Sequence, residues 1–257
     1  MTSEALDSND LVRTYWNSRI HDLDISRNPP GSPGFFADLD EYHFDKLHHL
    51  LRLVDFDGQR GKNVLDVGCG TGVDLVRFAQ AGAIATGVDI APSAIDLARL
   101  NFEQRKLSAA LVVADGEHLP LPDAAFDLVF AHGVVQYTSN AQALVNECRR
   151  VLKPGGQAIF QVYNRISWLN LLSKLMKVDL EHEDAPVLRK YSAAEFRALL
   201  TGFSDVQLVP ERFPVKSRLH KGWKGTLYNT FFVGTFNAMP RALVRRYGWH
   251  LLAFCRR

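Results

Sequence analysis

Between residues 63 and 163, short apolar runs alternate with longer segments in which apolar residues recur at helical spacing. We predict strands at Asn63–Val67, Ile84–Ile90, Ala109–Ala114, Phe126–Ala131 and Gln157–Tyr163, and helices near Val73–Ala81, Pro92–Lys106 and Ala141–Leu152. Strands buried on both faces of a parallel sheet read as continuous apolar runs, and a crossover helix joins each to the next. The alternation therefore predicts a doubly wound α/β fold around a mostly parallel sheet.

The first 62 residues read as a helical lead-in to this sheet. Leu11–Trp16 is apolar and aromatic at helical spacing, and the Pro- and Gly-rich stretch Asn28–Gly34 interrupts it. A second helix is expected where apolar residues recur on one face, at Phe44, Leu47, Leu50, Leu51 and Val54.

After Tyr163 the simple alternation stops. An apolar amphipathic helix is expected over Ser167–Val178, and Ser192 with Glu195 forms a capping-box pattern that predicts a helix over Ala193–Leu200. Val206–Val209 and His250–Cys255 are expected to complete a seven-stranded sheet. The segment between these two strands, Glu211–Tyr247, is too long for a plain connection, so it is predicted to be a cap or a functional loop. We predict a lead-in or lid at 1–62, a core at 63–210, a basic aromatic cap at 211–249 and a final core strand at 250–257.

Charge divides the chain unevenly. Residues 1–210 hold 20 Lys and Arg against 27 Asp and Glu, a net charge of −7, whereas residues 211–257 hold 10 against 1, a net of +9. A basic segment of this kind attracts an anionic substrate, an anionic membrane surface or nucleic acid, or is simply a solvated face.

The apolar runs, cysteines and histidines of the chain indicate its cellular compartment and disfavour a metal site. No apolar run approaches the roughly 20 residues of a membrane span, and the N-terminus has no signal-like apolar region, so a cytoplasmic protein is expected. Cys69, Cys148 and Cys255 are widely spaced and odd in number, which disfavours a disulfide framework or zinc site. The nine histidines include His48 and His49 but show no metal-ligand spacing, so no metal is expected.

A glycine-rich turn, Gly68-x-Gly70-x-Gly72, follows the first predicted strand and precedes a helix. Such a turn presents backbone N–H groups to a ligand, because glycine removes the side chain that would block the approach. A dinucleotide-binding turn would place its third glycine where Val73 stands, and the Lys-Ser/Thr ending of a nucleoside-triphosphate loop is missing. The spacing therefore disfavours both ligands.

The run Val64–Gly72 instead resembles the first motif of class I S-adenosylmethionine-dependent methyltransferases. Residues 63–163 resemble the core of that family's small-molecule group, which includes the quinone-ring (menaquinone- and ubiquinone-type) enzymes. The resemblance implies a Rossmann-like methyltransferase fold with S-adenosylmethionine as cofactor. It also implies that the methionine part of the cofactor faces the turn residues Gly68, Cys69, Gly70, Thr71 and Gly72, with Asp66 near its ammonium group.

Three further motifs extend the resemblance. Asp89, followed by Ile90 at the end of the second strand, is expected on the ribose hydroxyls, although it also fits an acid at a helix N-terminus. Asp115, Gly116 and Glu117 are expected around adenine, with an ordinary turn as the alternative for Asp115. At the end of the fourth strand, the residues expected to border the transferred methyl are Ala131, His132 and Gly133.

Methyl transfer from a sulfonium is an in-line displacement, so a general base is optional. His132 is the candidate base, and its alternative role is packing against adenosine or bonding a backbone carbonyl. Gln136 and Tyr137 join it as candidate catalytic residues. The other candidates for the acceptor pocket are Tyr163, Asn164 and Arg165, and Arg165 indicates that the acceptor carries an anionic group. The candidates for an N-terminal lid are Tyr15, Trp16, Tyr42 and His43.

The leading hypothesis is methylation of a small molecule on O, N, C or S. The alternatives are a catalytically silent cofactor-binding regulatory subunit and a nucleic-acid methyltransferase, with a nicotinamide oxidoreductase disfavoured by the turn spacing. A nucleic-acid substrate is disfavoured, because the Asn/Asp-Pro-Pro-Tyr-type motif of nucleic-acid methyltransferases is missing after the fourth strand. Ala131-His132-Gly133-Val134 stands in its place. The basic, aromatic C-terminal segment and the helix after Ser167 also permit peripheral contact with an anionic membrane, or a lid over the acceptor.

Overall fold

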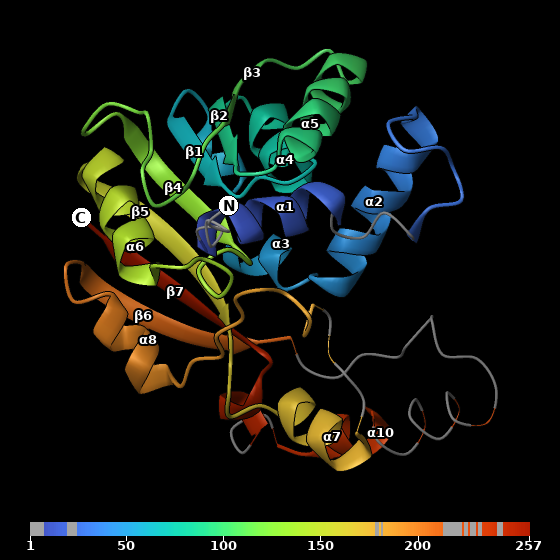
Figure 1. Cartoon of the computed structure of the whole chain (residues 1–257). Helices are drawn as coiled ribbons and strands as arrows, with labels where there is room; N and C mark the ends of the chain where they lie inside the picture. Colours follow the sequence, from blue (N-terminus) through green and yellow to red (C-terminus); the bar gives the residue numbers. More distant parts are fainter. Residues whose placement is uncertain are drawn as a thin grey trace, which may run out of the picture.

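The computed structural model describes residues 8–19, 25–177, 180, 182–212, 223, 226, 230, 233–240 and 244–257 (Figure 1). At its centre lies a seven-stranded sheet in the order β3-β2-β1-β4-β5-β7-β6. Its strands are β1 Asn63–Val67, β2 Ile84–Asp89, β3 Ala109–Val113, β4 Phe126–His132, β5 Leu152–Tyr163, β6 Ser204–Glu211 and β7 His250–Arg256. Strands β1 to β5 pair in parallel, and β7 is antiparallel to both β5 and β6. The predicted seven-stranded, mostly parallel sheet is confirmed.

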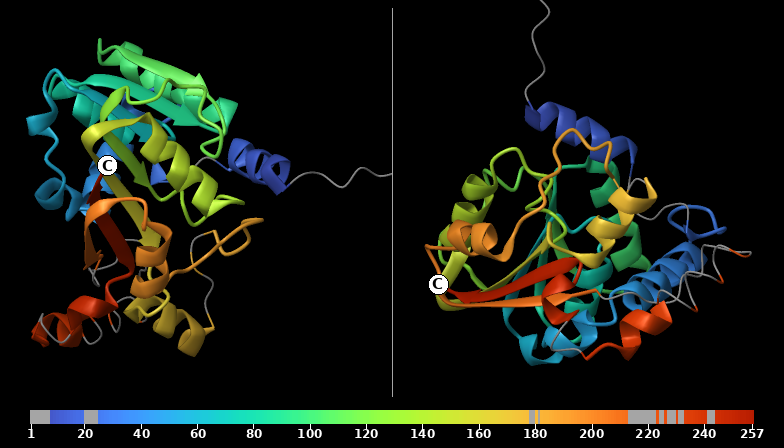
Figure 2. Two further views of the ribbon diagram at one scale, coloured as in Figure 1. Left: turned by 90° about the vertical axis from the view of Figure 1, so that its left-hand side faces the viewer. Right: turned by 90° about the horizontal axis from the view of Figure 1, so that it is seen from below.

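Helices cover both faces of the sheet because side chains alternate between the faces along each strand (Figures 1 and 2). Val64 and Leu128 point to one face, where they pack with residues of α3 (Leu50–Leu53) and α4 (Val73–Gln80). Leu65 and Val129 point to the other face, where they pack with α6 (Ala141–Val151) and α8 (Ala193–Leu199). The remaining described helices are α1 Ser8–Ser18, α2 Pro33–Lys46, α5 Pro92–Gln104, α7 Trp168–Met176 and α10 Val233–Ala238, with the short 3-10 turns η2 Asp57–Gln59 and η4 Arg245–Tyr247.

The lead-in differs from the prediction of one helix across residues 44–54. Helix α2 ends at Lys46, and a turn separates it from α3, which begins at Leu50. The helix also starts earlier than expected, because the Ser32 side chain caps it by accepting the Phe35 N–H and proline occupies the first turn. Leu47, Leu50 and Val54 share one buried cluster with Phe44 packed against it, whereas Leu51 is exposed. The apolar pattern therefore predicted burial at four of its five positions and did not predict the break.

The second half of the core follows its local signals closely. Ser192 and Glu195 form the predicted capping box, with Ser192 Oγ accepting the Glu195 N–H and the Glu195 carboxylate accepting the Ser192 N–H. Strand β5 begins at Leu152, earlier than the predicted Gln157, because Leu152 already pairs with Phe126 across a register shift.

Most of the predicted cap at 211–249 lies outside the described residues, as do Val178 and Met1–Asp7. Within the part of the chain that is described, no helix has both the length and the apolar character needed to cross a membrane.

Candidate active site

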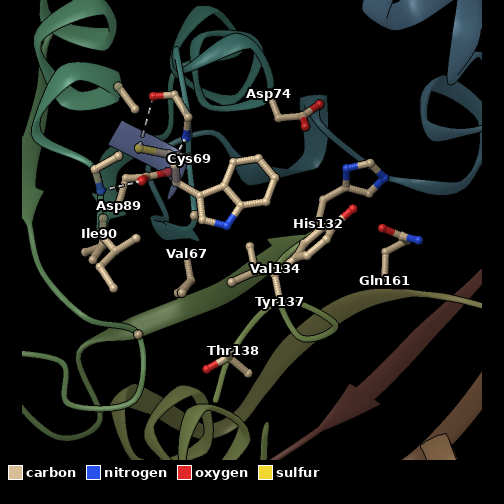
Figure 3. Close-up of a pocket in the computed structure, with 18 of the residues that line it drawn as sticks. Val67, Cys69, Asp74, Asp89, Ile90, His132, Val134, Tyr137, Thr138 and Gln161 are labelled. Carbon is tan, nitrogen blue, oxygen red and sulfur yellow. Dashed lines mark hydrogen bonds between the residues drawn. The ribbon is translucent and has the colours of Figure 1, made fainter. Parts of the chain in front are cut away.

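A cavity of about 240 Å³ opens where β1, β2 and β4 end (Figure 3). The carboxyl ends of parallel strands are where ligands bind in open α/β sheets. Its wall includes most of the residues predicted from sequence: Gly68, Cys69, Gly70, Thr71, Asp89, Ile90, Asp115, Gly116, Glu117, His132 and Tyr137. Figure 3 shows Cys69, Asp89 and Ile90 on one side of the cavity and His132 and Gln161 on the other.

The three glycines of the turn all have positive φ, at 71°, 54° and 80°, and each has its own reason to lack a side chain. A Cβ on Gly68 would lie 2.1 Å from Val134 Cγ2, so the turn and the segment after β4 could not pack. A Cβ on Gly72 would press on Phe102 of α5 at 3.3 Å. Gly70 has no atom within 4 Å of a Cβ position and lines the cavity, which leaves its backbone open to a ligand.

Asp89 ties the end of β2 to the glycine turn. Its Oδ2 accepts the Gly70 N–H and its Oδ1 accepts the Ala91 N–H, both at 2.9 Å. Burial raises the pKa of Asp89, and the backbone N–H donors act in the opposite direction. Each carboxylate oxygen keeps a second lone pair, so the group can still accept two hydroxyl protons from a ligand in the cavity.

Asp115 and Glu117 organise the loop after β3. Asp115 Oδ1 accepts the Glu117 N–H at 2.9 Å, and its Oδ2 accepts from the Asn9 side chain at 2.8 Å. Glu117 Oε1 accepts the Asn140 N–H at 2.8 Å and the Thr138 hydroxyl at 2.5 Å, which joins this loop to the one before α6. Glu117 therefore has a structural role beyond its place in the cavity wall.

Four of the predicted site residues do not reach the cavity wall. Asp66 is buried behind the turn, where burial and then the charges of Asp74 and Asp89 raise its pKa well above the ordinary value. Gly72 lies under Phe102, and Ala131 belongs to the core on the α6 face. Gln136 is fully buried, and neither atom of its amide has a hydrogen-bond partner among the described residues.

Four imidazoles, His43, His49, His132 and His250, form a cluster beyond the turn. Ring centroids are 6.1 Å apart for His43 and His132, 5.7 Å for His132 and His250, and 5.7 Å for His250 and His49. His132 stands at the end of β4 with its ring stacked on Phe130. We call these four residues the imidazole cluster.

His43 forms a pair with a buried carboxylate. Its Nε2 lies 3.0 Å from Asp74 Oδ1, and both residues line the cavity. Burial tends to raise the pKa of Asp74, but the charge of His43 and its hydrogen bond outweigh burial and lower that pKa. The pair sets the orientation of an imidazole that comes from the lead-in helix α2.

The far end of the cavity is built by β5, β7 and the residue after β6. Gln161, Tyr163, Arg212 and His250 line it. Gln161 is 1% exposed, and its Nε2 has no hydrogen-bond partner within the described part of the chain. Arg212 Nη1 lies 3.2 Å from His250 Nε2.

Two of the four residues predicted for an N-terminal lid reach the cavity wall. Trp16 and His43 line the cavity, and the Trp16 ring lies 4.9 Å from that of Tyr137. Asn9 bonds Asp115, while Asn17 accepts the Ser93 N–H at 3.0 Å, so α1 lies across the segments that follow β2 and β3 (Figure 2).

The other residues predicted for the lid and the acceptor pocket lie away from the cavity wall. Tyr15 turns away to donate to Asp184, and Tyr42 does not line the cavity. Asn164 bonds the Arg246 and Gly248 carbonyls, and the exposed Arg165 pairs with Glu195 at 2.9 Å. Both are therefore structural.

The lining residues that were not selected from the sequence include the polar or charged side chains of Lys46, Asp74, Gln161, Arg212 and His250. Asp74 follows the glycine turn directly, so its position was a usable signal. Lys46 ends helix α2, and the other three lie on or directly after strands that are far apart in the chain, so only the tertiary structure brings them together. Among the described residues, no group of three or more His, Cys, Asp or Glu side chains is arranged to hold a metal, and all three cysteines are buried free thiols.

Residues 65–160 match the sequence model of the family described as "Methyltransferase domain". A ubiquinone biosynthesis O-methyltransferase from Coxiella burnetii is 37% identical over 106 residues, covering 41% of this chain and 45% of that protein. A malonyl-[acyl-carrier protein] O-methyltransferase from Serratia marcescens is 37% identical over 121 residues, covering 47% of this chain and 46% of that protein. The chain thus spans about half the length of these curated relatives.

Solved structures share the fold over nearly the whole chain. Magnesium protoporphyrin IX methyltransferase from Synechocystis PCC 6803 has a TM-score of 0.62 at 17% identity and covers 100% of both chains. Geranyl diphosphate C-methyltransferase from Streptomyces coelicolor A3(2) has a TM-score of 0.62 at 16% identity, covering 99% of this chain and 100% of that one. The predicted Rossmann-like methyltransferase fold is confirmed.

Proposed function

We propose that this chain, in which residues 65–160 form a methyltransferase domain, transfers a methyl group from S-adenosylmethionine to a small-molecule acceptor. One observation carries the proposal. Asp89 and Asp115, at the ends of the adjacent strands β2 and β3, line the same cavity as the open backbone of Gly70 and the His132 side chain. The names of the relatives, which act in ubiquinone biosynthesis or on malonyl-[acyl-carrier protein], support a metabolic acceptor.

The cofactor's charges and hydroxyls match the residues around the turn. The free lone pairs of Asp89 suit the ribose hydroxyls, because charge-assisted hydrogen bonds are stronger than neutral ones. The Asp115 carboxylate and the Gly116 N–H suit the amino group and ring of adenine. Gly70 leaves room for the methionine part. Asp66 is buried behind the turn and does not line the cavity, so its place near the ammonium group stays a prediction.

For the acceptor, this chain's residues have to align a lone pair with the methyl group and exclude water. Alignment of this kind supplies about 7–11 kcal/mol in well-oriented reactions. Where the accepting atom carries a proton, an imidazole can receive it. The imidazoles that line the cavity include His132, at the end of β4, and His43, held by Asp74. Tyr137 lies beside them, with its hydroxyl donating to Tyr163 at 3.2 Å.

Calorimetry followed by a turnover screen tests the proposal. We expect S-adenosylmethionine and S-adenosylhomocysteine to bind and NAD not to bind, and we expect release of S-adenosylhomocysteine with at least one of a set of phenols, thiols, amines, carboxylic acids and prenylated quinones. Tight NAD binding without S-adenosylmethionine binding would contradict the proposal. Cofactor binding without turnover across the set would favour a silent regulatory subunit, and salt-sensitive binding and methylation of RNA or DNA would favour a nucleic-acid substrate.

A cytoplasmic location with peripheral membrane contact is a further part of the proposal. Leu171 and Leu175 of α7 are 70% and 78% exposed, and Ile166 before that helix is also exposed. Apolar side chains beside basic ones are typical of helices that lie on anionic membranes. Flotation with acidic vesicles tests the contact: we expect binding that is lost in the double variant Leu171→Ser, Leu175→Ser, and no binding by the wild type would contradict it.

A further inference from the structure

We infer that Gln161 helps to select the methyl acceptor, by donating a hydrogen bond from its side-chain N–H to an oxygen that the acceptor carries beside the accepting atom. The inference rests on the proposed function and adds a residue that determines its specificity. Gln161 lies on β5, inside the seven-stranded sheet, and its side chain lines the cavity. It is 1% exposed, so it is shielded from the solvent around the protein.

The face of the sheet around Gln161 changes from apolar to polar at this residue. Ile159, two residues earlier on the same face of β5, belongs to a buried apolar cluster with Phe130 and Leu252. Gln161 comes next and pairs with His132 of β4 in the strand register. An apolar side chain here would simply extend the cluster, whereas a buried polar group without a partner lowers stability. A glutamine at this position therefore favours a role in binding.

The amide of Gln161 has a donor that the protein does not use. Its Nε2 is buried and has no hydrogen-bond partner in the described part of the chain. Gln136 does not supply one, although Gln136 Nε2 and Gln161 Oε1 lie 3.9 Å and 3.8 Å from the same point, the position of a Cβ on Gly133. Because the large majority of buried polar groups in proteins are hydrogen-bonded, the partner of Gln161 Nε2 is expected to come from a ligand.

The backbone of β5 prevents Gln161 from turning away from the cavity. The residue pairs with His132 of β4 on one side and with Leu252 of β7 on the other. A strand held on both sides cannot shift to bring this amide to the protein surface. In Figure 3 the Gln161 side chain lies beside that of His132, across the cavity from Cys69 and Asp89.

The segment after β4 brings Gln161 close to the glycine turn. Val134 packs so tightly on Gly68 that a Cβ on that glycine would lie 2.1 Å from Val134 Cγ2. The preceding residue, Gly133, borders the Gln161 amide. These two residues therefore bridge the turn and Gln161. An acceptor bound to Gln161 would have its neighbouring atoms beside the cofactor that the turn is proposed to bind.

The amide nitrogen determines what the acceptor has to present. Nε2 of glutamine only donates hydrogen bonds, so its partner must be an atom with a lone pair. A carbonyl, hydroxyl or ether oxygen meets this condition, whereas an ammonium group would leave the N–H without a partner. The cavity wall also carries the rings of His132, Tyr137 and Tyr163, and aromatic rings pack well on a flat molecule. A flat probe with a carbonyl oxygen therefore suits both features.

The test uses the S-adenosylhomocysteine complex and two flat probes of nearly the same shape, acetophenone and α-methylstyrene. The second probe has a CH₂ group in place of the carbonyl oxygen of the first. NMR titration gives the ratio of the two affinities, and this ratio is expected to shift against acetophenone by at least about 5-fold in Gln161→Met, which keeps the side-chain length without the donor. Gln157→Met, at the other end of β5 and outside the cavity wall, is the matched control and should keep the wild-type ratio.

Thermal unfolding separates a binding role from a structural one. If Gln161 served only the fold, for example by bonding an internal water, its replacement would lower the unfolding midpoint of the ligand-free protein. We expect no fall, because Gln161→Met removes a buried donor that has no partner in the described part of the chain.

Four results would overturn the inference: an unchanged affinity ratio in Gln161→Met, an equal shift in Gln157→Met, binding of neither probe, and a lower unfolding midpoint in Gln161→Met. Failure of the wild type to bind S-adenosylhomocysteine would contradict the proposed function. Normal cofactor binding with an unchanged affinity ratio would contradict only this inference.

Discussion

The two ends of the cavity differ in how the chain builds them. At the end with the glycine turn, called the cofactor end after the proposed function, the lining residues between Val67 and Glu117 follow three adjacent strands. Hydrogen bonds such as that from the Gly70 N–H to the Asp89 carboxylate fix them. At the opposite end, called the acceptor end, Lys46, Gln161, Arg212 and His250 come from four segments far apart in sequence. One end is a local backbone structure with acidic side chains, and the other is a long-range assembly of side chains around neutral imidazoles.

This difference indicates which properties each end can change. A turn fixed by glycines and backbone bonds tolerates few substitutions, since all three glycines have positive φ and two of them, Gly68 and Gly72, leave no room for a side chain. Side chains that converge from separate strands can be exchanged one at a time without disturbing the sheet. We therefore expect substitutions at the cofactor end to abolish binding, and those at the acceptor end to alter selectivity.

The largest effect is expected for Gly68→Ala. The new Cβ would lie 2.1 Å from Val134 Cγ2 at a φ of +71°, so the turn would have to move away from its ligand-binding form. We expect calorimetry to show a loss of S-adenosylmethionine affinity of at least about 100-fold, together with a strain of about 1–3 kcal/mol in the free energy of unfolding. Gly155→Ala is the matched control. Gly155 has a similar φ of +76°, and no atom lies within 4 Å of the position of a Cβ. It stands near the start of β5, away from the cavity.

The control should lower stability slightly and leave cofactor affinity unchanged. If both variants bound the cofactor equally well, the close packing of Gly68 on Val134 would not matter, and the turn would not be the rigid element of this end.

A smaller loss is expected for Asp89→Asn. The amide cannot accept both backbone N–H groups with its two terminal atoms, and it loses the charge-assisted bonds proposed for the ribose hydroxyls. We expect about a 10-fold to 100-fold weaker S-adenosylmethionine affinity by calorimetry, in line with the loss of one or two hydrogen bonds to a charged group. Asp96→Asn removes the same charge from an exposed pair with Arg99 on α5, and it should leave the affinity unchanged. Equal losses in both variants would point to net charge rather than to the Asp89 site.

Sequence alone predicted most of the residues that line the cavity around the glycine turn, because the information there is local. Strand, turn and helix are adjacent in the chain, and the glycine spacing and the acids after β2 and β3 lie within short motifs. The one-faced apolar pattern over residues 44–54 predicted burial at every position except Leu51, yet it missed the break after Lys46. Periodicity reports which side chains face the core, and a short turn between two helices can preserve that register.

The acceptor end could not be predicted because it depends on strand order. His250 meets Tyr163 only because β7 inserts between β5 and β6, and Arg212 reaches the cavity only because β6 ends beside β7. The sequence instead offered Asn164, which bonds backbone carbonyls, and Arg165, which pairs with Glu195 at the surface. Position after a strand predicts which end of the sheet a residue occupies, but not whether its side chain faces the cavity.

A pH-dependent effect on stability tests the neutral imidazoles. Burial, with the charges of His132 and other basic groups, lowers the pKa of His49 to about 3 from an ordinary 6.5. Between these values the unfolded chain binds a proton that the folded chain does not, so the free energy of unfolding falls as pH falls through this window. The contribution of one such group approaches about 1.4 kcal/mol per pH unit well below 6.5.

His49→Phe keeps a ring beside His250 and removes the titrating group. Denaturant unfolding between pH 7 and pH 5 should show a shallower decline in this variant than in the wild type. His48→Phe, at an exposed neighbour, should keep the wild-type slope. Identical slopes in all three proteins would mean that His49 does not stay neutral in the folded protein over this pH range.

The smallest effect is expected at Arg165, which its position after a strand had indicated as a residue that binds an anionic group. Arg165 and Glu195 are each about half exposed, at 51% and 49%, and exposed ion pairs contribute about 0–1 kcal/mol to stability. Arg165→Gln should therefore change the free energy of unfolding by less than about 1 kcal/mol and leave the S-adenosylmethionine affinity unaltered. Equilibrium unfolding and calorimetry measure the two quantities. A clear loss of cofactor affinity in Arg165→Gln would mean that this surface cation acts on the site. The contrast between a local cofactor end and a long-range acceptor end would then fail, because position after a strand would have been enough to find a functional residue of the far end.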